Sequence, residues 1–595
     1  MSMGVLPSDP VPEIETQWQP DPEITSIPES AIADTKKDDI TSATESDHIQ
    51  DDQDLLQRQY ELSQLDRTSQ SNWVKIKKLT VCGVAFLNDA YDMFAINIVA
   101  MILGFVYYND AQGDAKNTVP KKWDTLIKVA VQIGCLLGQL VMGRLGDKIG
   151  RTTVYAASLM IAIITTVASA FSSSMVRGFN VFVVLFIWRV LLGFGIGGDY
   201  PLTASIVSEY SGVHNRGKTM AAVFAFQGFG NVLAPIVSII VTACFMQSIG
   251  RDVLYLDYVW RIIVGVGCIP GVATLYWRLT MAESERFQNL NSNGGNNDDD
   301  DDDTGLSTPS SEHEKPLVSS SPQNNTENDG ANSVAVQEGA EIESQPYSVA
   351  HLSSDDGRQE TRQAKTFGQY FGEWKHLRVL LGTSIAWLSL DIAFYGINLN
   401  SSIVIGAIGF AGNLLTDQPG HFIIYNCLGN IIINLLGSVP GYWITVFLIE
   451  RMGRKKIQLM GFLVLAILYL ILGFGYHQIL DKSAGAFIFL FALAQLFQNF
   501  GPNVTTFVIP GEVFPTRFRS TAHGISAASG KLGAIIAQGG FLQLTDMGGK
   551  NAWIDHLLQV FALFMLVGAG ATFWIPETKG RTLEEICDPN EEYVD

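Results

Sequence analysis

The fold of this chain is decided by a short charged stretch between two apolar runs, Gly143-Arg144-Leu145-Gly146-Asp147-Lys148-Ile149-Gly150-Arg151. The acid and the last arginine of this stretch have counterparts 303 residues later, and so do an acid and an arginine that flank another short loop. The four pairs are Asp147 with Glu450, Arg151 with Arg454, Glu209 with Glu512, and Arg216 with Arg519. One offset shared by four charged positions predicts two parallel repeats of one helical unit, with a binding site near the midplane between them.

Apolar runs fill most of the sequence on either side of this stretch. The chain has 595 residues, of which 47% are hydrophobic and only 16% are charged, whereas soluble chains average about 25% charged residues. Each run approaches the ~20 residues that cross a bilayer as a helix. We expect helices at about 79–106, 124–144, 152–173, 180–210, 217–245, 258–279, 377–402, 421–449, 457–476, 484–511, 520–545 and 552–576. The sequence therefore predicts an all-α membrane protein with twelve transmembrane helices in two pseudo-symmetric six-helix halves.

Two acidic segments flank the first of these halves. Residues 1–70 hold 16 acidic and 4 basic residues, and residues 282–365 hold 18 and 5. Both segments lack an apolar face, so we expect them to be disordered. They carry more negative charge than the net −20 of the chain, which argues against a nucleic-acid partner. The predicted regions are an acidic N-terminal tail (1–72), a first six-helix half (73–281), an acidic linker (282–365), a second six-helix half (366–577) and a C-terminal tail (578–595). Regulation by kinases or ubiquitin attachment on the tails stays an open alternative.

Basic residues predict how the chain crosses the membrane. They gather in alternate short loops, which the positive-inside rule assigns to the cytoplasm. They are Arg144, Lys148, Arg151, Arg216, Lys218, Arg451, Arg454, Lys455, Lys456, Arg517 and Arg519. Both termini and the central linker are therefore expected on the cytoplasmic side.

Polar and ionisable side chains also lie inside the apolar runs. An ionisable group is costly in lipid and marks a functional site by default. The set comprises Asp89, Asp92, Arg189, Asp199, Tyr200, Gln227, Trp387, Asp391, Tyr395, Asn499, Asn503 and Lys531. Trp387, Asp391 and Tyr395 follow one another at intervals of four residues, which places them on one helix face. Aromatic residues at this spacing often only pack, but the aspartate between them indicates a face that does not meet lipid.

The charged loops carry a family resemblance. The stretch 143–151 resembles the loop signature of the major facilitator superfamily, and Pro576-Glu577-Thr578-Lys579-Gly580 resembles the end signature of its sugar-porter-like branch. We expect the eight repeated charges to pair across the cytoplasmic ends of helices and to bias inward-closed against outward-closed states, rather than to contact substrate. Because charges at the membrane surface can stay hydrated at little cost, we expect these side chains to be hydrated.

Over residues 72–590 the chain resembles the phosphate:proton symporters of this superfamily, of the fungal high-affinity and plant root type. The matching segments are Gly197–Tyr210, Trp387–Asn400, Asn499–Phe514 and Arg519–Lys531. The resemblance implies a plasma-membrane protein that imports inorganic phosphate together with protons. The phosphate contacts that it implies are Tyr200, Gln227, Trp387, Asp391, Tyr395 and Asn503. It also implies proton movement through Asp89, Asp92 and Asp199, with Arg189 and Lys531 as charge partners. Asn88 stands where many relatives have a hydroxyl residue.

The chemistry of phosphate suggests how the two fluxes are coupled. Phosphate offers acceptor oxygens and, when protonated, donor hydroxyls, so hydroxyl, indole and amide groups can surround it. An ionised Asp391 would repel the anion, whereas a protonated Asp391 would donate a hydrogen bond to it. We therefore expect phosphate to bind when Asp391 is protonated, which biases the alternating states. Two interpretations of Asp89 and Asp92 stay open: they relay protons, or they balance the charges of Arg189 and Lys531.

Two other functions compete with phosphate import. A proton-coupled sugar or organic-acid porter of the same fold would share the loop signatures, although the acids in the fourth and seventh helices argue against it. A receptor that senses phosphate would use the long cytoplasmic segments for signalling, and one protein could both transport and sense. We do not expect an enzyme, because the sequence contains no Walker loop, dinucleotide fingerprint or nucleophile elbow. Nor do we expect a cofactor or metal, since the six cysteines form no CxxC or Cys/His cluster.

Overall fold

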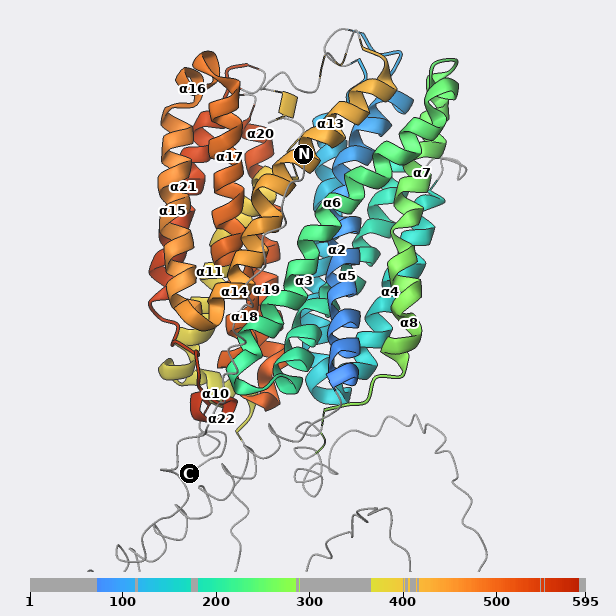
Figure 1. Cartoon of the computed structure of the whole chain (residues 1–595). Helices are drawn as coiled ribbons and strands as arrows, with labels where there is room; N and C mark the ends of the chain where they lie inside the picture. The colour runs from blue at the N-terminus through green and yellow to red at the C-terminus, as the bar shows by residue number, and fades with distance from the viewer. Residues whose placement is uncertain are drawn as a thin grey trace, which may run out of the picture. The chain divides into compact units, whose positions relative to one another are not determined.

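The computed structural model describes residues 72–112, 116–172, 180–284, 365–399, 417–545, 547–549 and 552–587, together with a few isolated positions between them. The predicted N-terminal tail apart from Asn72, nearly all of the predicted linker and the last eight residues lie outside this part of the chain. The described residues all belong to one compact unit of the protein. They are organised as long helices that run along a common direction (Figure 1).

The first group of helices lies within residues 72–279. Its members are α2 (Asn72–Tyr107), α3 (Lys121–Ile149), α4 (Arg151–Ala170), α5 (Val181–Tyr210), α6 (Arg216–Ile249), α7 (Leu256–Val266) and α8 (Cys268–Leu279). The last two continue one another across Gly267 and form a single membrane span. Pro270 lies in the first turn of α8, where its missing N–H costs least, and this explains the interruption.

The second group begins at residue 367 and is more often interrupted. Its members are α10 (Phe367–Gly372), α11 (Trp374–Asn398), α13 (Pro419–Ile433), α14 (Val439–Met452), α15 (Arg454–Phe474), α16 (Tyr476–Lys482), α17 (Ala484–Gln498), α18 (Val504–Val513), α19 (Arg519–Ile536), α20 (Leu542–Leu544), α21 (Ile554–Thr572) and α22 (Leu583–Ile586). Single π-helical turns join α13 to α14 (Asn434–Ser438), α17 to α18 (Asn499–Asn503) and α19 to α20 (Ala537–Phe541).

Within the described residues, eleven helices are long and apolar enough to cross a membrane. The twelfth expected span, at 520–545, corresponds to α19 and its continuation. It falls short of that criterion because α19 is rich in small residues and carries Arg519, His523 and Lys531. Yet α19 packs closely against both α3 and α11. A helix enclosed in this way need not be apolar all round, so the all-α membrane fold is as predicted.

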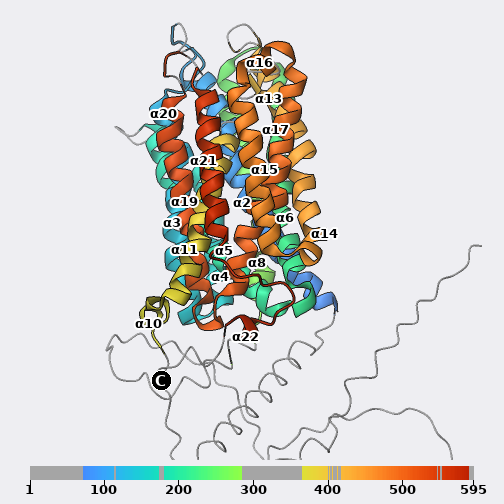
Figure 2. The same cartoon turned by 90° about the vertical axis from the view of Figure 1, so that its left-hand side faces the viewer.

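The two groups of helices lie on opposite sides of the bundle. Figure 1 shows α2 to α8, coloured blue to green, beside α10 to α22, coloured yellow to red, and Figure 2 shows the second group from its own side. Contact between the groups is made where α19 packs on α3 and where α13 and α14 pack on α6. We call residues 143–151 the decisive stretch. The loop of this stretch and its repeat around Glu450 and Arg454 lie at the same end of the bundle as α10 and α22. We call this end the charged end.

Glycines bring α3 and α19 into close contact near the charged end. A Cβ added to Gly143 would lie 2.6 Å from the carbonyl oxygen of Ser520, and one added to Gly524 would lie 2.4 Å from that of Gln139. Neither position has room for a side chain without separating the helices, as at other membrane interfaces built from small residues. Gly143, the first residue of the decisive stretch, is therefore needed for contact between the two halves.

Candidate functional site

The predicted stripe on α11 forms one wall of a buried polar site. Trp387, Asp391 and Tyr395 are each at most 2% exposed. Lys531 of α19 points its amino group at this wall. Its Nζ atom lies 3.3 Å from Oδ2 of Asp391 and donates a 2.6 Å hydrogen bond to the hydroxyl oxygen of Tyr395. The sequence predicted a role for Asp391 as a phosphate contact and for Lys531 as a charge partner, but it did not predict that the two residues pair.

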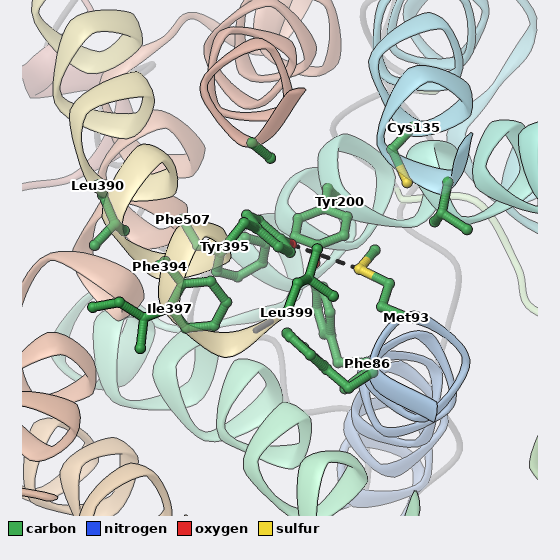
Figure 3. Packing of buried hydrophobic residues seen from close by; sticks show 14 of the residues in the cluster. Phe86, Met93, Cys135, Tyr200, Leu390, Phe394, Tyr395, Ile397, Leu399 and Phe507 are labelled. Atoms are coloured by element: carbon green, nitrogen blue, oxygen red, sulfur yellow. Dashed lines mark hydrogen bonds between the residues drawn. The ribbon is translucent and has the colours of Figure 1, made fainter. Parts of the chain in front are cut away.

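Tyr200 of α5 faces this wall from the first half of the bundle. Its ring centroid lies 6.4 Å from that of Trp387, and the Nζ atom of Lys531 lies 5.1 Å from the Tyr200 ring centroid and 4.3 Å from that of Tyr395. Figure 3 shows Tyr200 and Tyr395 approaching each other from different helices. The ammonium group of Lys531 is thus held between two aromatic rings and a carboxylate, with one tyrosine from each half.

Aromatic and sulfur-containing side chains close one side of the site. Phe86 packs edge-on against both Tyr200 and Phe507, each at a centroid distance of 5.2 Å. The hydroxyl of Tyr395 also lies 3.6 Å from the sulfur of Met93 (Figure 3). This side of the site is therefore apolar, and electrostatic interactions of Lys531 are stronger beside such a lining than in water.

Gly530 lets α19 approach the α11 wall. A Cβ at this position would lie 2.5 Å from Cδ1 of Trp387 and 2.8 Å from Oδ2 of Asp391. Both distances are shorter than an ordinary carbon contact of about 3.5 Å. Sequence reasoning did not assign Gly530 to the site, although it directly precedes Lys531 in one of the matching segments.

Asn503 lies at a break in the helix that α17 and α18 form. Phe500 and Gly501 depart from helical dihedral angles, with φ/ψ of −82°/61° and 172°/−129°. The Nδ2 atom of Asn503 donates 2.7 Å hydrogen bonds to the hydroxyl of Tyr442 and to Oδ1 of Asn499. The continuous helix expected from the apolar run is therefore interrupted where it carries these polar side chains.

Tyr442 of α14 connects Asn503 with the neighbourhood of Gln227, and sequence reasoning missed it. Its ring approaches the position of a Cβ on Gly228 to 2.9 Å, directly beside Gln227. Gln227 itself is buried, and its Oε1 atom has no hydrogen-bond partner among the described residues. Tyrosine in an apolar run gives a weak signal, which explains the omission.

Gln139 of α3 is a second residue that sequence reasoning missed. Its side chain is fully buried, and neither polar atom of its amide has a partner among the described residues. Buried polar groups normally have partners, so this amide is suited to meet a water or a polar ligand. The 303-residue offset relates Gln139 to Tyr442, which extends the internal repeat to the interior.

The two acids of α2 have different surroundings. Oδ2 of Asp92 accepts hydrogen bonds of 3.3 Å from both Asn88 and Thr166, and Arg189 donates a 3.2 Å bond to the backbone oxygen of Asp92. Asp89 is equally buried, but its Oδ2 atom has no partner within the described part of the chain. The structure therefore places Arg189 beside Asp92.

Asp199 is held by Arg278 of α8, which sequence reasoning overlooked. Nη2 and Nη1 of Arg278 lie 2.8 and 3.0 Å from the two carboxylate oxygens, and Ser158 donates a third bond of 2.7 Å. The guanidinium also stacks over Tyr155, with Cζ 3.9 Å from the ring centroid. Arg278 lies inside an expected apolar run, so the argument that singled out the buried aspartates would also have found it.

At the charged end, the acid Glu209 joins the two halves. Arg151 forms an ion pair with its carboxylate and lies 3.6 Å from Asp147. Nη1 of Arg519, which comes from the other half, lies 3.0 Å from the same Glu209 oxygen. The decisive stretch is thus tied directly to the start of α19.

The repeat of this arrangement lies in the second half. Arg454 pairs with Glu450 at 2.6 Å and with Glu512 at 3.0 Å. Arg216 of the first half donates a 3.4 Å hydrogen bond to the backbone oxygen of Arg581, beyond the end signature. Each half therefore pairs its own acids and arginines at this end and reaches across to the other.

Helix N-termini complete the contacts across the halves. Asp147 accepts hydrogen bonds of 3.2 and 2.7 Å from the backbone amides of Ser520 and Thr521 at the start of α19. Glu450 accepts a 3.0 Å bond from the amide of Lys218 at the start of α6. Lys218 and Thr521 are again 303 residues apart. A carboxylate at a helix N-terminus is stabilised by the unpaired amides there.

The expectation that these charges remain hydrated is wrong for most of them. Arg151, Arg216, Arg454 and Arg519 are at most 1% exposed, and Glu512 is equally buried. Charges shielded from water need partners of opposite sign, and the network supplies them. The opposite end of the bundle is closed by a neutral contact, a 2.9 Å hydrogen bond from Asn97 of α2 to the backbone oxygen of Asn398.

Within residues 72–587, where they are described, His, Cys, Asp and Glu side chains do not form a group of three that could hold a metal ion.

The fold has two groups of helices that are joined by charged loops at one end and that enclose a polar site. This arrangement is typical of a class of membrane transporters. The model of the Major Facilitator Superfamily matches residues 94–538, and the chain belongs to that superfamily. A solved structure of the proton:xylose symporter XylE superposes with a TM-score of 0.59 at 16% identity, and a solved structure of a D-xylose-proton symporter with a TM-score of 0.53 at 18% identity. Each covers 86% of this chain and at least 98% of that protein. These structures support the fold alone.

Within this superfamily, the chain belongs to the family of inorganic phosphate transporters. It is 38% identical to the inorganic phosphate transporter PHO84 of Saccharomyces cerevisiae, over 92% of this chain and 89% of that protein. It is 38% identical to the repressible high-affinity phosphate permease of Neurospora crassa, over 91% and 90%. The inorganic phosphate transporter 1-6 of Oryza sativa is 35% identical, over 89% and 95%.

Proposed function

We propose that this protein imports inorganic phosphate with protons across the plasma membrane by alternating access. The names of its fungal and plant relatives support phosphate as the substrate. The observation that carries the proposal is the position of Lys531, whose ammonium lies between Asp391, Tyr395 and Tyr200 in a buried site. A cation beside hydroxyl and indole donors suits a small oxyanion, whereas a sugar presents no charge for it to balance.

The pair of Asp391 and Lys531 suggests how a proton controls phosphate binding. When Asp391 is ionised, its carboxylate neutralises Lys531 at 3.3 Å and would repel an approaching anion. Protonation of Asp391 removes that repulsion and leaves the charge of Lys531 available to phosphate. Phosphate then binds much better to the protonated protein, and this differential affinity is what couples the two fluxes.

The phosphate contacts in this proposal come from both halves. Tyr200 and Gln227 approach from the first half, and Trp387, Asp391, Tyr395 and Asn503 from the second. Tyr442 joins them through its hydrogen bond to Asn503. Donors from both halves would let the bound anion draw the two halves together, which is the step that alternating access requires.

The remaining acids take different roles. Asp89, with an unpartnered buried oxygen, is the better candidate for carrying a proton. Asp92 is held by Asn88 and Thr166 beside Arg189. Asp199 is fixed by a bidentate pair with Arg278, so its contacts favour a structural counter-charge over a proton carrier.

The charged end acts as a gate in this proposal. Its ion pairs and helix caps join the halves where the positive-inside rule expects the cytoplasm. They would have to open for phosphate to leave on that side. The eight repeated charges then bias the protein towards the state that is closed to the cytoplasm, and they do not contact the substrate.

Uptake into sealed vesicles tests the function. Purified full-length protein in liposomes should accumulate labelled phosphate when the outside is acidic, and an imposed pH difference of the opposite sign should reduce the uptake. Excess unlabelled sugar should not compete. Sugar competition would favour the porter alternative, and binding of phosphate without movement would favour the sensor.

A further inference from the structure

Gln139 of α3 is a buried amide that the mechanism proposed above does not use. Its side chain is fully buried, and neither Nε2 nor Oε1 has a hydrogen-bond partner among the described residues. It is the one buried amide in this part of the chain for which both polar atoms lack a partner. Because an unpaired buried polar group is destabilising and rare in native proteins, this amide is suited to a ligand that has both donors and acceptors.

The backbone of Gln139 lies where three helices meet. A Cβ added to Gly197 of α5 would lie 2.9 Å from the backbone nitrogen of Gln139, and one added to Gly524 of α19 would lie 2.4 Å from its backbone oxygen. These close approaches join α3 to the helix that carries Tyr200 and to the helix that carries Lys531. Gln139 therefore lies between the helices of two residues that we assign to the phosphate site.

The internal repeat relates Gln139 to the assigned phosphate contacts. The offset of 303 residues pairs Gln139 with Tyr442 and Tyr200 with Asn503. In the second half these two positions are joined, because Asn503 donates a 2.7 Å hydrogen bond to the hydroxyl of Tyr442. In the first half the amide of Gln139 has no such bond within the described residues. The pair in the second half is thus satisfied internally, whereas the equivalent pair in the first half leaves an amide for a ligand.

A second relation of the same kind involves Lys531. The 303-residue offset pairs Lys531 with Gly228, and the ring of Tyr442 approaches the position of a Cβ on Gly228 to 2.9 Å. Since Gln139 is the equivalent of Tyr442, the repeat directs its side chain towards Lys531. An anion that is attracted by the ammonium group of Lys531 would then meet the amide of Gln139.

The amide of Gln139 and inorganic phosphate match in their hydrogen-bonding groups. A glutamine side chain offers two N–H donors and an acceptor oxygen. Phosphate offers acceptor oxygens and keeps at least one hydroxyl donor near neutral pH. Nε2 can therefore donate to a phosphate oxygen while Oε1 accepts from a phosphate hydroxyl. Sulfate has the same shape but no hydroxyl, so it would leave Oε1 unpaired and facing its own oxygens.

We propose that Gln139 contacts phosphate and selects protonated oxyanions, namely phosphate and arsenate, over sulfate. This inference rests on the proposed function and adds a determinant of specificity to the same site. The charge of Lys531 attracts any small anion, whereas a neutral group that carries both donor and acceptor distinguishes a protonated anion from an unprotonated one. Specificity is a difference of affinities, and a polar group that the wrong ligand leaves unpaired produces such a difference.

Binding to the purified full-length protein tests this proposal independently of transport. The affinity for labelled phosphate is measured directly, and those for arsenate and sulfate from their displacement of the label. The test variant is Gln139→Met, which keeps the length of the side chain but removes its donors and its acceptor. The control is Gln132→Met, because Gln132 is also buried and lies about two turns earlier in the same helix, outside the assigned site. Thermal unfolding without ligand provides a second readout for each variant.

We expect Gln139→Met to bind phosphate and arsenate about tenfold more weakly than wild type, as for the loss of two hydrogen bonds. Its affinity for sulfate should stay within about threefold of wild type, since sulfate uses only half of the amide. The control should bind all three anions within about twofold of wild type. Without ligand, Gln139→Met should unfold at the same or a higher temperature, because it removes an unpaired buried polar group.

An unchanged ratio of phosphate to sulfate affinity in Gln139→Met would overturn the proposal. An equal loss for all three anions, or an equal loss of phosphate affinity in Gln132→Met, would do the same. A lower unfolding temperature of ligand-free Gln139→Met would show that the amide has a structural role instead. Failure of the wild-type protein to bind phosphate would contradict the proposed function itself, so the two failures are distinguishable.

Discussion

Replacing Gly530 with alanine tests whether the phosphate site depends on the close approach of α19 to α11. The new Cβ would lie 2.5 Å from Cδ1 of Trp387 and 2.8 Å from Oδ2 of Asp391. Restoring an ordinary contact of about 3.5 Å requires a displacement of about 1 Å. Overpacking of this kind costs about 1–3 kcal/mol. The side chains that would be displaced are Trp387 and Asp391, which we assign to phosphate and its coupled proton.

We therefore expect Gly530→Ala to lower phosphate uptake by about 5- to 150-fold, which is the free energy of the overpacking converted at 1.36 kcal/mol per factor of ten. The assay is initial uptake of labelled phosphate into proteoliposomes driven by an acidic exterior. Gly570→Ala is the matched control, because Gly570 also lies in a helix of the second half but has open space around it. It should transport like wild type and be equally or slightly more stable. Wild-type uptake by Gly530→Ala would refute the packing argument.

Three further predictions concern the buried ion pair of Asp199 and the contacts that join the two halves at the charged end and at the opposite end of the bundle. Arg278→Met should destabilise the protein by about 3–5 kcal/mol in thermal or denaturant unfolding, because it leaves Asp199 buried without its partner; unchanged stability would contradict the assigned ion pair. Asp147→Ala and Glu450→Ala should each make cysteine probes on the cytoplasmic side more accessible to thiol reagents, and to similar extents. The reason is that both acids cap equivalent helices across the halves. Strongly unequal effects would argue against the repeat at this end. Asn97→Ala should shift accessibility the other way, towards the outside, by removing a bond across the opposite closure, and a shift towards the cytoplasm would contradict that role.

The internal repeat explains why so much of the fold could be predicted from sequence. Charges at equal offsets report directly on equivalent positions, and the helices around them follow from apolar length. The stripe of Trp387, Asp391 and Tyr395 was predictable for a similar reason, since helical periodicity alone places it on one face. The helix ends observed differ from those expected by a few residues at most places.

Residues that act through close packing or through long-range pairing could not be predicted. Gly530 matters because of what a Cβ would touch, which no local pattern reveals. Tyr442 and Gln139 are polar groups within apolar runs that carry no costly charge to mark them. Hydrophobicity likewise does not show the helix break at Phe500 and Gly501, because it depends on backbone dihedral angles.

The partners of the buried charges illustrate the same limit. The sequence contains both members of each pair, but only the packing of α4 against both α5 and α8 brings Asp199 to Arg278. Similarly, the folded bundle decides that Lys531 pairs with Asp391 rather than with an acid on α2. The sequence predicted that the charges in the loops would pair. It did not predict their burial, because the burial results from contact between the two halves.

The central claim is that protonation of Asp391 releases Lys531 to phosphate, and the variant Asp391→Asn tests it most directly. The asparagine cannot lose a proton, so the variant should still exchange internal for external labelled phosphate in proteoliposomes. It should fail to accumulate phosphate against its gradient when the outside is acidic. Uphill accumulation by Asp391→Asn at the wild-type level would contradict the account.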